Sequence, residues 1–126
     1  MLSVPAISVV DDDEASRLAI ASLVRSLGWK ANVFESAEQY LHLLSSAPAD
    51  HTACLISDIK MPGMSGIELH ERLLASGRAP PTIFVTAFAT DPLRAQVMAN
   101  GALALLEKPI DAGALAHYLT VAAGTP

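Results

Sequence analysis

The sequence predicts an α/β fold, a doubly wound sheet of five parallel strands that alternate with five helices. Apolar runs of strand length recur five times along the 126 residues, at 6–10, 30–34, 53–57, 82–86 and 104–107. A helical pattern follows each run, so strand and helix alternate strictly. Such alternation is typical of a parallel sheet with helices on both faces, and apolar strands suit burial from both sides.

Capping signals set the expected bounds of the first three helices. The first helix places Ile20, Leu23, Val24 and Leu27 on one face and stops at Gly28. Two later pairs have the spacing of a capping box, Ser36 with Gln39 and Ser65 with Glu68. The second pair precedes an apolar stripe formed by Leu69, Leu73 and Leu74, and Gly77 is expected to end this helix.

The last two helices begin at aspartates. Asp91 and Pro92 are expected as the N-cap and the first residue of a helix that ends at Gly101. Asp111 is expected to cap the last helix, whose apolar residues are Leu115, Tyr118 and Leu119. The predicted unit is therefore (βα)5, a single domain over residues 1–126, with residues 121–126 as the possible start of a linker.

Composition excludes several classes of protein. The longest apolar stretches are far shorter than the roughly 20 residues that cross a bilayer, and the N-terminus has no basic signal region, so we expect a cytoplasmic protein without membrane contact. A net charge of −5 and eight scattered Lys and Arg residues argue against direct nucleic acid binding. The lone Cys54 is expected as a buried, inert thiol.

The four histidines show no spacing typical of metal ligands, and we expect them on the surface: His42, His51, His70 and His117.

Polar residues follow four of the predicted strands. Asp11, Asp12 and Asp13 come after the first strand and Asp58 after the third, while Thr86 ends the fourth and Lys108 ends the fifth. The carboxyl ends of parallel strands meet at one edge, which is where such sheets bind ligands. We therefore expect these side chains to form one site.

The acidic run "VVDDDE" needs a compensating cation. Two like charges about 4 Å apart repel by roughly 4 kcal/mol at an effective dielectric constant of about 20. Carboxylates without Cys or His favour Mg²⁺ over zinc. Beside such an ion, Asp58 can act as a nucleophile on phosphorus, while Thr86 donates a hydrogen bond and Lys108 neutralises charge.

Together the motifs "VVDDDE", "ISDIKMPGMSGIEL", "FVTA" and "EKP" resemble the receiver domain of two-component response regulators, of the FixJ type, over about residues 6 to 120. The resemblance implies a flavodoxin-like strand order 2-1-3-4-5 and a cis bond between Lys108 and Pro109. It implies phosphorylation of Asp58, with Thr86 and Lys108 contacting the phosphoryl group. For Mg²⁺ it implies the acidic pair, the phospho-acceptor and one carbonyl: Asp11, Asp12, Asp58 and Lys60.

One position departs from the family. Receivers usually carry an aromatic residue three positions before the lysine, which turns inward when the threonine moves, and here that position is Leu105. The switch from Thr86 to the surface would then depend on aliphatic repacking. Lys60 and Phe88 are expected beside the path of a hydrolytic water, where neither accepts its hydrogen bond well, so they would control the lifetime of the phosphorylated state.

The resemblance also implies partners and an output. A sensor histidine kinase would donate the phosphoryl group, and the protein would catalyse only its own phosphotransfer and dephosphorylation. The output, expected to be regulation of transcription, would involve the helix at 91–100, the strand at 104–107 and the last helix. A homodimer through the first two of these is one expected result.

Two alternatives remain. A haloacid dehalogenase-type phosphohydrolase also places an Asp-x-Asp, here Asp11 and Asp13, after its first strand, but it needs an acidic pair after the lysine, where this chain has only Asp111. A pseudo-receiver that acts without phosphorylation would keep the same fold.

Overall fold

The computed structural model describes residues 5–46 and 52–126. Its sheet has five parallel strands in the order β2-β1-β3-β4-β5, which confirms both the predicted fold and the strand order. The strands are β1 Ala6–Val10, β2 Lys30–Phe34, β3 Thr52–Asp58, β4 Thr82–Thr86 and β5 Ala104–Glu107. The helices are α1 Glu14–Ser26, α2 Ala37–Ser46, α3 Gly66–Ala75, α4 Asp91–Ala99 and α5 Ala112–Ala123.

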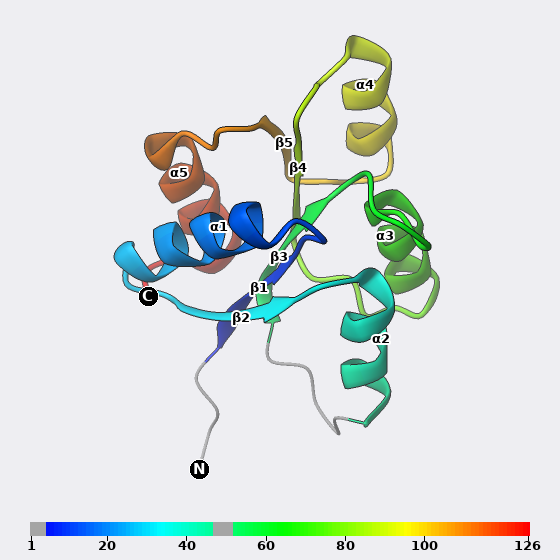
Figure 1. Ribbon diagram of the computed structural model, residues 1–126, viewed down its shortest axis with the longest axis horizontal. Coiled ribbons are helices and arrows are strands. Elements are labelled where there is room, and N and C mark those ends of the chain that lie inside the picture. The colour runs from blue at the N-terminus through cyan, green and yellow to red at the C-terminus, as the bar shows by residue number, and fades with distance from the viewer. Residues whose placement is uncertain (1–4, 47–51) are drawn as a thin grey trace.

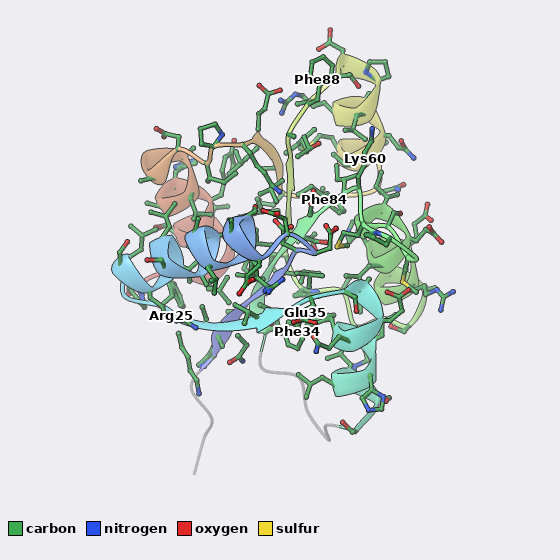
Figure 2. The ribbon with its side chains drawn as sticks, viewed as in Figure 1. Arg25, Phe34, Glu35, Lys60, Phe84 and Phe88 are labelled. Atoms are coloured by element: carbon green, nitrogen blue, oxygen red, sulfur yellow. The ribbon has the colours of Figure 1, made fainter. Side chains whose placement is uncertain are left out.

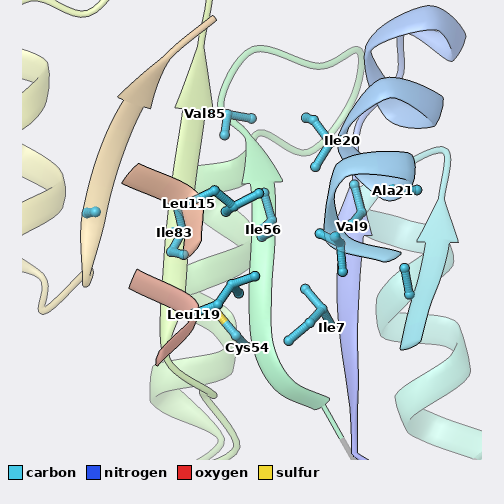
Figure 3. Packing of buried hydrophobic residues seen from close by; sticks show 13 residues of the cluster. Ile7, Val9, Ile20, Ala21, Cys54, Ile56, Ile83, Val85, Leu115 and Leu119 are labelled. Carbon is cyan, nitrogen blue, oxygen red and sulfur yellow. The ribbon is translucent and has the colours of Figure 1, made fainter. Parts of the chain in front are cut away.

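The helices form two layers around the sheet. Figure 1 shows α1 and α5 on one face and α2, α3 and α4 on the other. On the first face, buried side chains of the central strands, among them Ile7, Val9 and Ile56, pack in one cluster with Leu115 and Leu119 of α5 (Figure 3). α5 continues through Ala123, so the first half of the predicted linker is helical.

Burial is uneven across the second face and the sheet edges. β1 and β4 are buried along their whole length, as expected for central strands, but β2 buries only Ala31 and Phe34 because it is an edge strand. α4 buries only Val97, which packs in a small cluster with Ile59, Phe84, Ala102 and Leu105. α4 is thus held to the sheet by few apolar contacts.

Most of the predicted helix ends are correct. Ser65 and Glu68 form the complete capping box, and Asp111 caps α5. The N-cap of α4 is Thr90 and not Asp91, because the Thr90 hydroxyl accepts from the Leu93 N–H. In the other predicted box, Ser36 Oγ accepts from Gln39 N, but the Gln39 side chain bonds Glu35 N instead of Ser36 N.

Two side chains of α3 differ from the prediction. Leu74 is 46% exposed, although the apolar stripe assigned it to the core. His70, expected on the surface, is buried, with its ring edge-on to Phe84 at 5.4 Å between centroids. Burial lowers the pKa of His70.

The predictions for the other histidines and for Cys54 can be compared with their burial. His42 and His117 are exposed, and His51 lies outside the described residues. Cys54 is buried, and burial raises its pKa to about 12, which fits an inert thiol. Among the described residues, no helix combines the length and the apolarity that crossing a bilayer requires.

Candidate functional site

Three carboxylates meet at the carboxyl ends of β1 and β3. Asp11 is fully buried, Asp58 is nearly so, and Asp12 is exposed. One oxygen of each lies within 4.8 Å of the others. The fourth residue of the acidic run, Asp13, points elsewhere: its side chain accepts from Ser16 N at 2.8 Å and caps α1. The site therefore combines an acidic pair with Asp58, as the motifs predicted.

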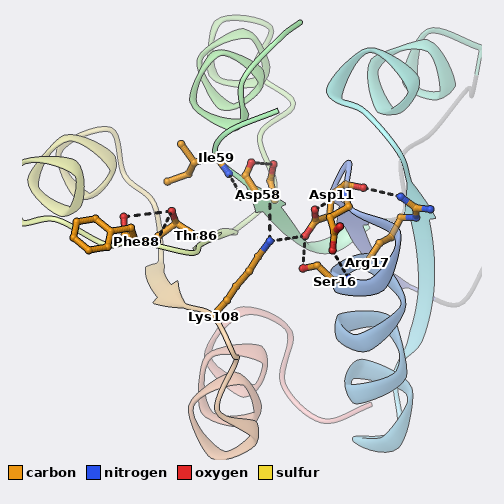
Figure 4. Close-up of polar contacts among 10 residues, drawn as sticks. Asp11, Ser16, Arg17, Asp58, Ile59, Thr86, Phe88 and Lys108 are labelled. Atoms are coloured by element: carbon orange, nitrogen blue, oxygen red, sulfur yellow. Dashed lines mark hydrogen bonds and ion pairs between the residues drawn. The ribbon is translucent and has the colours of Figure 1, made fainter. Parts of the chain in front are cut away.

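Lys108 joins these carboxylates from the end of β5. Its Nζ lies 3.0 Å from Asp11 Oδ2 and 3.3 Å from Asp58 Oδ2 (Figure 4). The Lys108–Pro109 bond is cis, as the resemblance implied. The ammonium group thus lies between two buried negative charges, which is the position from which it can also neutralise an incoming anion.

The backbone holds Asp58 closely. Ile59 N–H donates to Asp58 Oδ1 at 2.8 Å, and Ser57 Oγ donates to the Asp58 carbonyl at 2.9 Å. A Cβ at Gly66 would overlap that same carbonyl oxygen, and Gly66 N–H donates to Ile59 O at 2.9 Å. Glycine is required here because the start of α3 approaches the end of β3 backbone to backbone.

Two supporting residues on α1 escaped the sequence analysis. Ser16 Oγ donates to Asp11 Oδ2 at 2.7 Å, and Arg17 Nη1 donates to Asp11 O at 2.9 Å. Arg17 is buried and brings a second cation to the acidic cluster (Figure 4). A cation three residues after the acidic run, on the apolar face of the helix, was the available signal.

The charges shift two pKa values upward. Burial and the neighbouring Asp11 raise the pKa of Asp58, although Lys108 and the Ile59 N–H oppose them. Burial alone would lower the pKa of Lys108, but the hydrogen bonds and charges of Asp11 and Asp58 raise it overall. A carboxylate under this repulsion gains from a cation, so the cluster fits a divalent metal with oxygen ligands.

Thr86 bonds to Phe88 rather than to Asp58. Its Oγ1 accepts from Phe88 N at 3.4 Å and donates to Phe88 O at 3.5 Å. A pocket of about 420 Å³ is lined by residues that include Asp58, Lys60, Thr86, Phe88 and Lys108. These five predicted residues therefore line one cavity, whose volume is large enough to admit a phosphoryl group.

The remaining predicted residues border this pocket or lie behind it. Phe88 is 75% exposed and Lys60 is also exposed, both on the side of the molecule that carries α3 and α4 (Figure 2). Leu105 is buried on β5 beside Phe84 and Val97, behind the pocket. An aliphatic side chain thus fills the inward position.

The fold and this site define a class of protein. The family model of the response regulator receiver domain matches residues 7–120, so the chain belongs to that family. Receiver domains bind Mg²⁺ at an acidic pocket and are generally not classical enzymes. Membership of this family implies a histidine kinase as partner. The phosphohydrolase alternative is therefore not supported.

The curated relatives of the chain include a transcriptional regulatory protein and a response regulator. It is 36% identical over 105 residues to the transcriptional regulatory protein FixJ of Bradyrhizobium diazoefficiens, covering 83% of this chain and 50% of FixJ. It is 34% identical over 103 residues to the response regulator protein TodT of Pseudomonas putida, covering 82% of this chain and 44% of TodT. The chain thus spans about half the length of these curated relatives.

Solved structures agree. A response regulator receiver protein from Burkholderia phymatum superposes with a TM-score of 0.84 at 37% identity, covering 97% of both chains. The receiver FixJ-N superposes with a TM-score of 0.82 at 26% identity, covering 96% of this chain. The chain is a receiver domain related to the FixJ and TodT regulators, and its function is phosphorelay signalling.

Proposed function

We propose that Asp58 accepts a phosphoryl group from the phosphohistidine of a sensor kinase. The observation that carries this proposal is the position of its carboxylate, at the mouth of a pocket between the acidic pair and Lys108. An Asp58 oxygen attacks phosphorus, a P–O bond forms, and the P–N bond to the kinase imidazole breaks. The other oxygen, on the Ile59 N–H, keeps the carboxylate oriented.

Mg²⁺ would be held by Asp11, Asp12, Asp58 and the Lys60 carbonyl. The three carboxylates fit a metal ion because one oxygen of each lies within 4.8 Å of the others. The negative charge of Asp11 also repels Asp58, and a bound cation would relieve that repulsion. When bound, the ion supplies positive charge for the phosphoryl oxygens. The residues themselves do the rest: Lys108 neutralises a second oxygen, while Ser16 and Arg17 hold Asp11 in place.

Thr86 is the proposed switch. To donate to a phosphoryl oxygen it must give up both of its bonds to Phe88, which moves the loop before α4. The buried Leu105 repacks as the threonine leaves, and the change reaches the α4, β5 and α5 face. Apolar side chains there include the exposed Met98, so dimerisation through α4 and β5 is the proposed consequence.

The lifetime of the phosphorylated state follows from Lys60 and Phe88. Both border the pocket from which water approaches the phosphorus. Phenylalanine accepts no hydrogen bond and charged lysine only donates, so neither orients an attacking water. We therefore infer that phosphorylated Asp58 is hydrolysed slowly.

We also infer that the output is regulation of transcription and that the protein acts in the cytoplasm. This acidic domain would not itself contact nucleic acid.

The test is phosphorylation by acetyl phosphate with Mg²⁺, followed by intact mass. We expect one added phosphoryl group on the wild type and on Asp91→Asn, an exposed aspartate outside the pocket, and none on Asp58→Asn. Label on Asp58→Asn at the wild-type level would contradict the assignment. Absence of label on the wild type would favour the pseudo-receiver, and steady hydrolysis of added phosphoesters would favour a hydrolase.

A further inference from the structure

The loop that carries Phe88 is tied to the sheet by a side chain with no assigned role. The Ala89 N–H donates to Glu107 Oε2 at 2.8 Å. Glu107 ends β5, directly before Lys108, so the contact joins the loop before α4 to the strand that carries the lysine. Hydrogen bonds to a charged acceptor are among the stronger ones in proteins.

The same short segment is engaged by Thr86. Phe88, the residue before Ala89, holds the Thr86 hydroxyl through its N–H and its carbonyl. Ala89 itself packs against the small apolar cluster that contains Leu105 and Val97. These contacts and the hydrogen bond to Glu107 therefore favour one conformation of residues 88 and 89, and in that conformation the Thr86 hydroxyl is bonded to Phe88 and not to Asp58.

We propose that Glu107 is a positioning residue that holds the loop before α4 in the unphosphorylated conformation and so opposes the movement of Thr86 toward the phosphoryl group. The inference rests on the proposed function of Asp58. It deepens that function because it identifies a polar link between the threonine and β5 in a chain whose inward position is the aliphatic Leu105. A contact made in only one of two states shifts the equilibrium toward that state.

The expected effect is on the affinity for a phosphoryl mimic. With Mg²⁺ present, Glu107→Ala should bind beryllofluoride about threefold or more tightly than the wild type, a ratio within the net contribution of one hydrogen bond. Glu107→Gln keeps an oxygen that can accept from Ala89 N–H, so it should restore nearly wild-type affinity. Asp91→Ala is the control: it removes an exposed carboxylate from the first turn of α4 and should leave the affinity for beryllofluoride unchanged.

A second readout follows the hydrogen bond between Ala89 and Glu107 directly. The Ala89 amide proton is followed by NMR in the wild type, where its exchange with solvent should be slowed before beryllofluoride is added and faster afterwards. In Glu107→Ala it should exchange fast in both states.

Each outcome decides the inference. Unchanged or weaker binding by Glu107→Ala overturns the role of Glu107, and so does an Ala89 amide that stays protected in the bound wild type. Equal gains in Glu107→Ala and Glu107→Gln would show that only charge matters, which also overturns it. If wild-type protein does not bind the mimic at all, the proposed function of Asp58 fails, and the inference fails with it.

Discussion

Replacing Asp58 with asparagine should stabilise the metal-free protein. The carboxylates of Asp11 and Asp12 each lie within 4.8 Å of Asp58, and at an effective dielectric constant of about 20 each repels it by at least about 3.5 kcal/mol. The attraction that is lost, to Lys108 at 3.3 Å, is about 5 kcal/mol on the same scale. The two repulsions exceed the attraction by about 2 kcal/mol.

The measured gain should be about 1 to 2 kcal/mol, because Asp12 is exposed and solvent screens its part of the repulsion. Asparagine keeps an oxygen for the Ile59 N–H, so the local backbone is retained. The assay is urea unfolding at pH 7 in the presence of a chelator, with Asp91→Asn as the control for loss of one exposed charge. Mg²⁺ should then stabilise the wild type more than the variant.

The pH dependence of unfolding tests separately whether Asp58→Asn is more stable than the wild type. The folded-state pKa of Asp58 is raised above its ordinary value of 3.8, so the folded protein binds the proton more tightly than the unfolded chain does. The penalty of ionised Asp58 is present above the raised pKa and disappears as the pH falls below 3.8. The stability gap between variant and wild type should close over that interval. A variant less stable than wild type at pH 7, or a gap that does not narrow in acid, would refute the reasoning.

Three further predictions concern other parts of the site and α3. Asp12→Ala should weaken Mg²⁺ binding and raise metal-free stability; an unchanged affinity in a calorimetric titration would contradict it. Phe88→Glu or Lys60→Asn should speed hydrolysis of phosphorylated Asp58, and a tenfold faster rate needs only about 1.4 kcal/mol less activation free energy. The rate is measured as release of inorganic phosphate. If neither variant releases phosphate faster than the wild type, these two residues do not control the position of the attacking water. The pKa of His70 is lowered by burial, so stability should fall as the pH drops below 6.5, and His70→Leu, followed by urea unfolding, should lack that loss.

Much of this architecture could be predicted because it depends on local patterns. Each strand is a short apolar run, and the carboxyl ends of parallel strands share an edge, so Asp11, Asp58 and Lys108 had to converge. The cap at Thr90 was missed because Asp91 and Thr90 are both good N-caps, and only the backbone conformation shows which hydroxyl or carboxylate reaches the helix N–H groups.

The supporting residues depend on contacts between distant elements, which periodicity does not contain. The role of Arg17 depends on its contact with the Asp11 carbonyl at the end of β1, and the role of Glu107 depends on its contact with Ala89 in the loop before α4. Neither contact can be predicted from the spacing of residues in the sequence. On α3, His70 and Leu74 lie four residues apart, yet His70 is buried against Phe84 and Leu74 is exposed. Helical spacing places two such side chains on the same side of a helix but does not show where the neighbouring element ends.

The glycine at the start of α3 has a consequence for how this domain can diversify. Because Gly66 meets the Asp58 carbonyl through backbone atoms alone, the position of the Asp58 backbone is set by a rigid contact without a deformable side chain in between. Substitutions on the outer surface of α3, for example at Leu74, should therefore leave the position of Asp58 unchanged. The exposed side of this helix can vary in sequence while its first residue keeps the end of β3 in place.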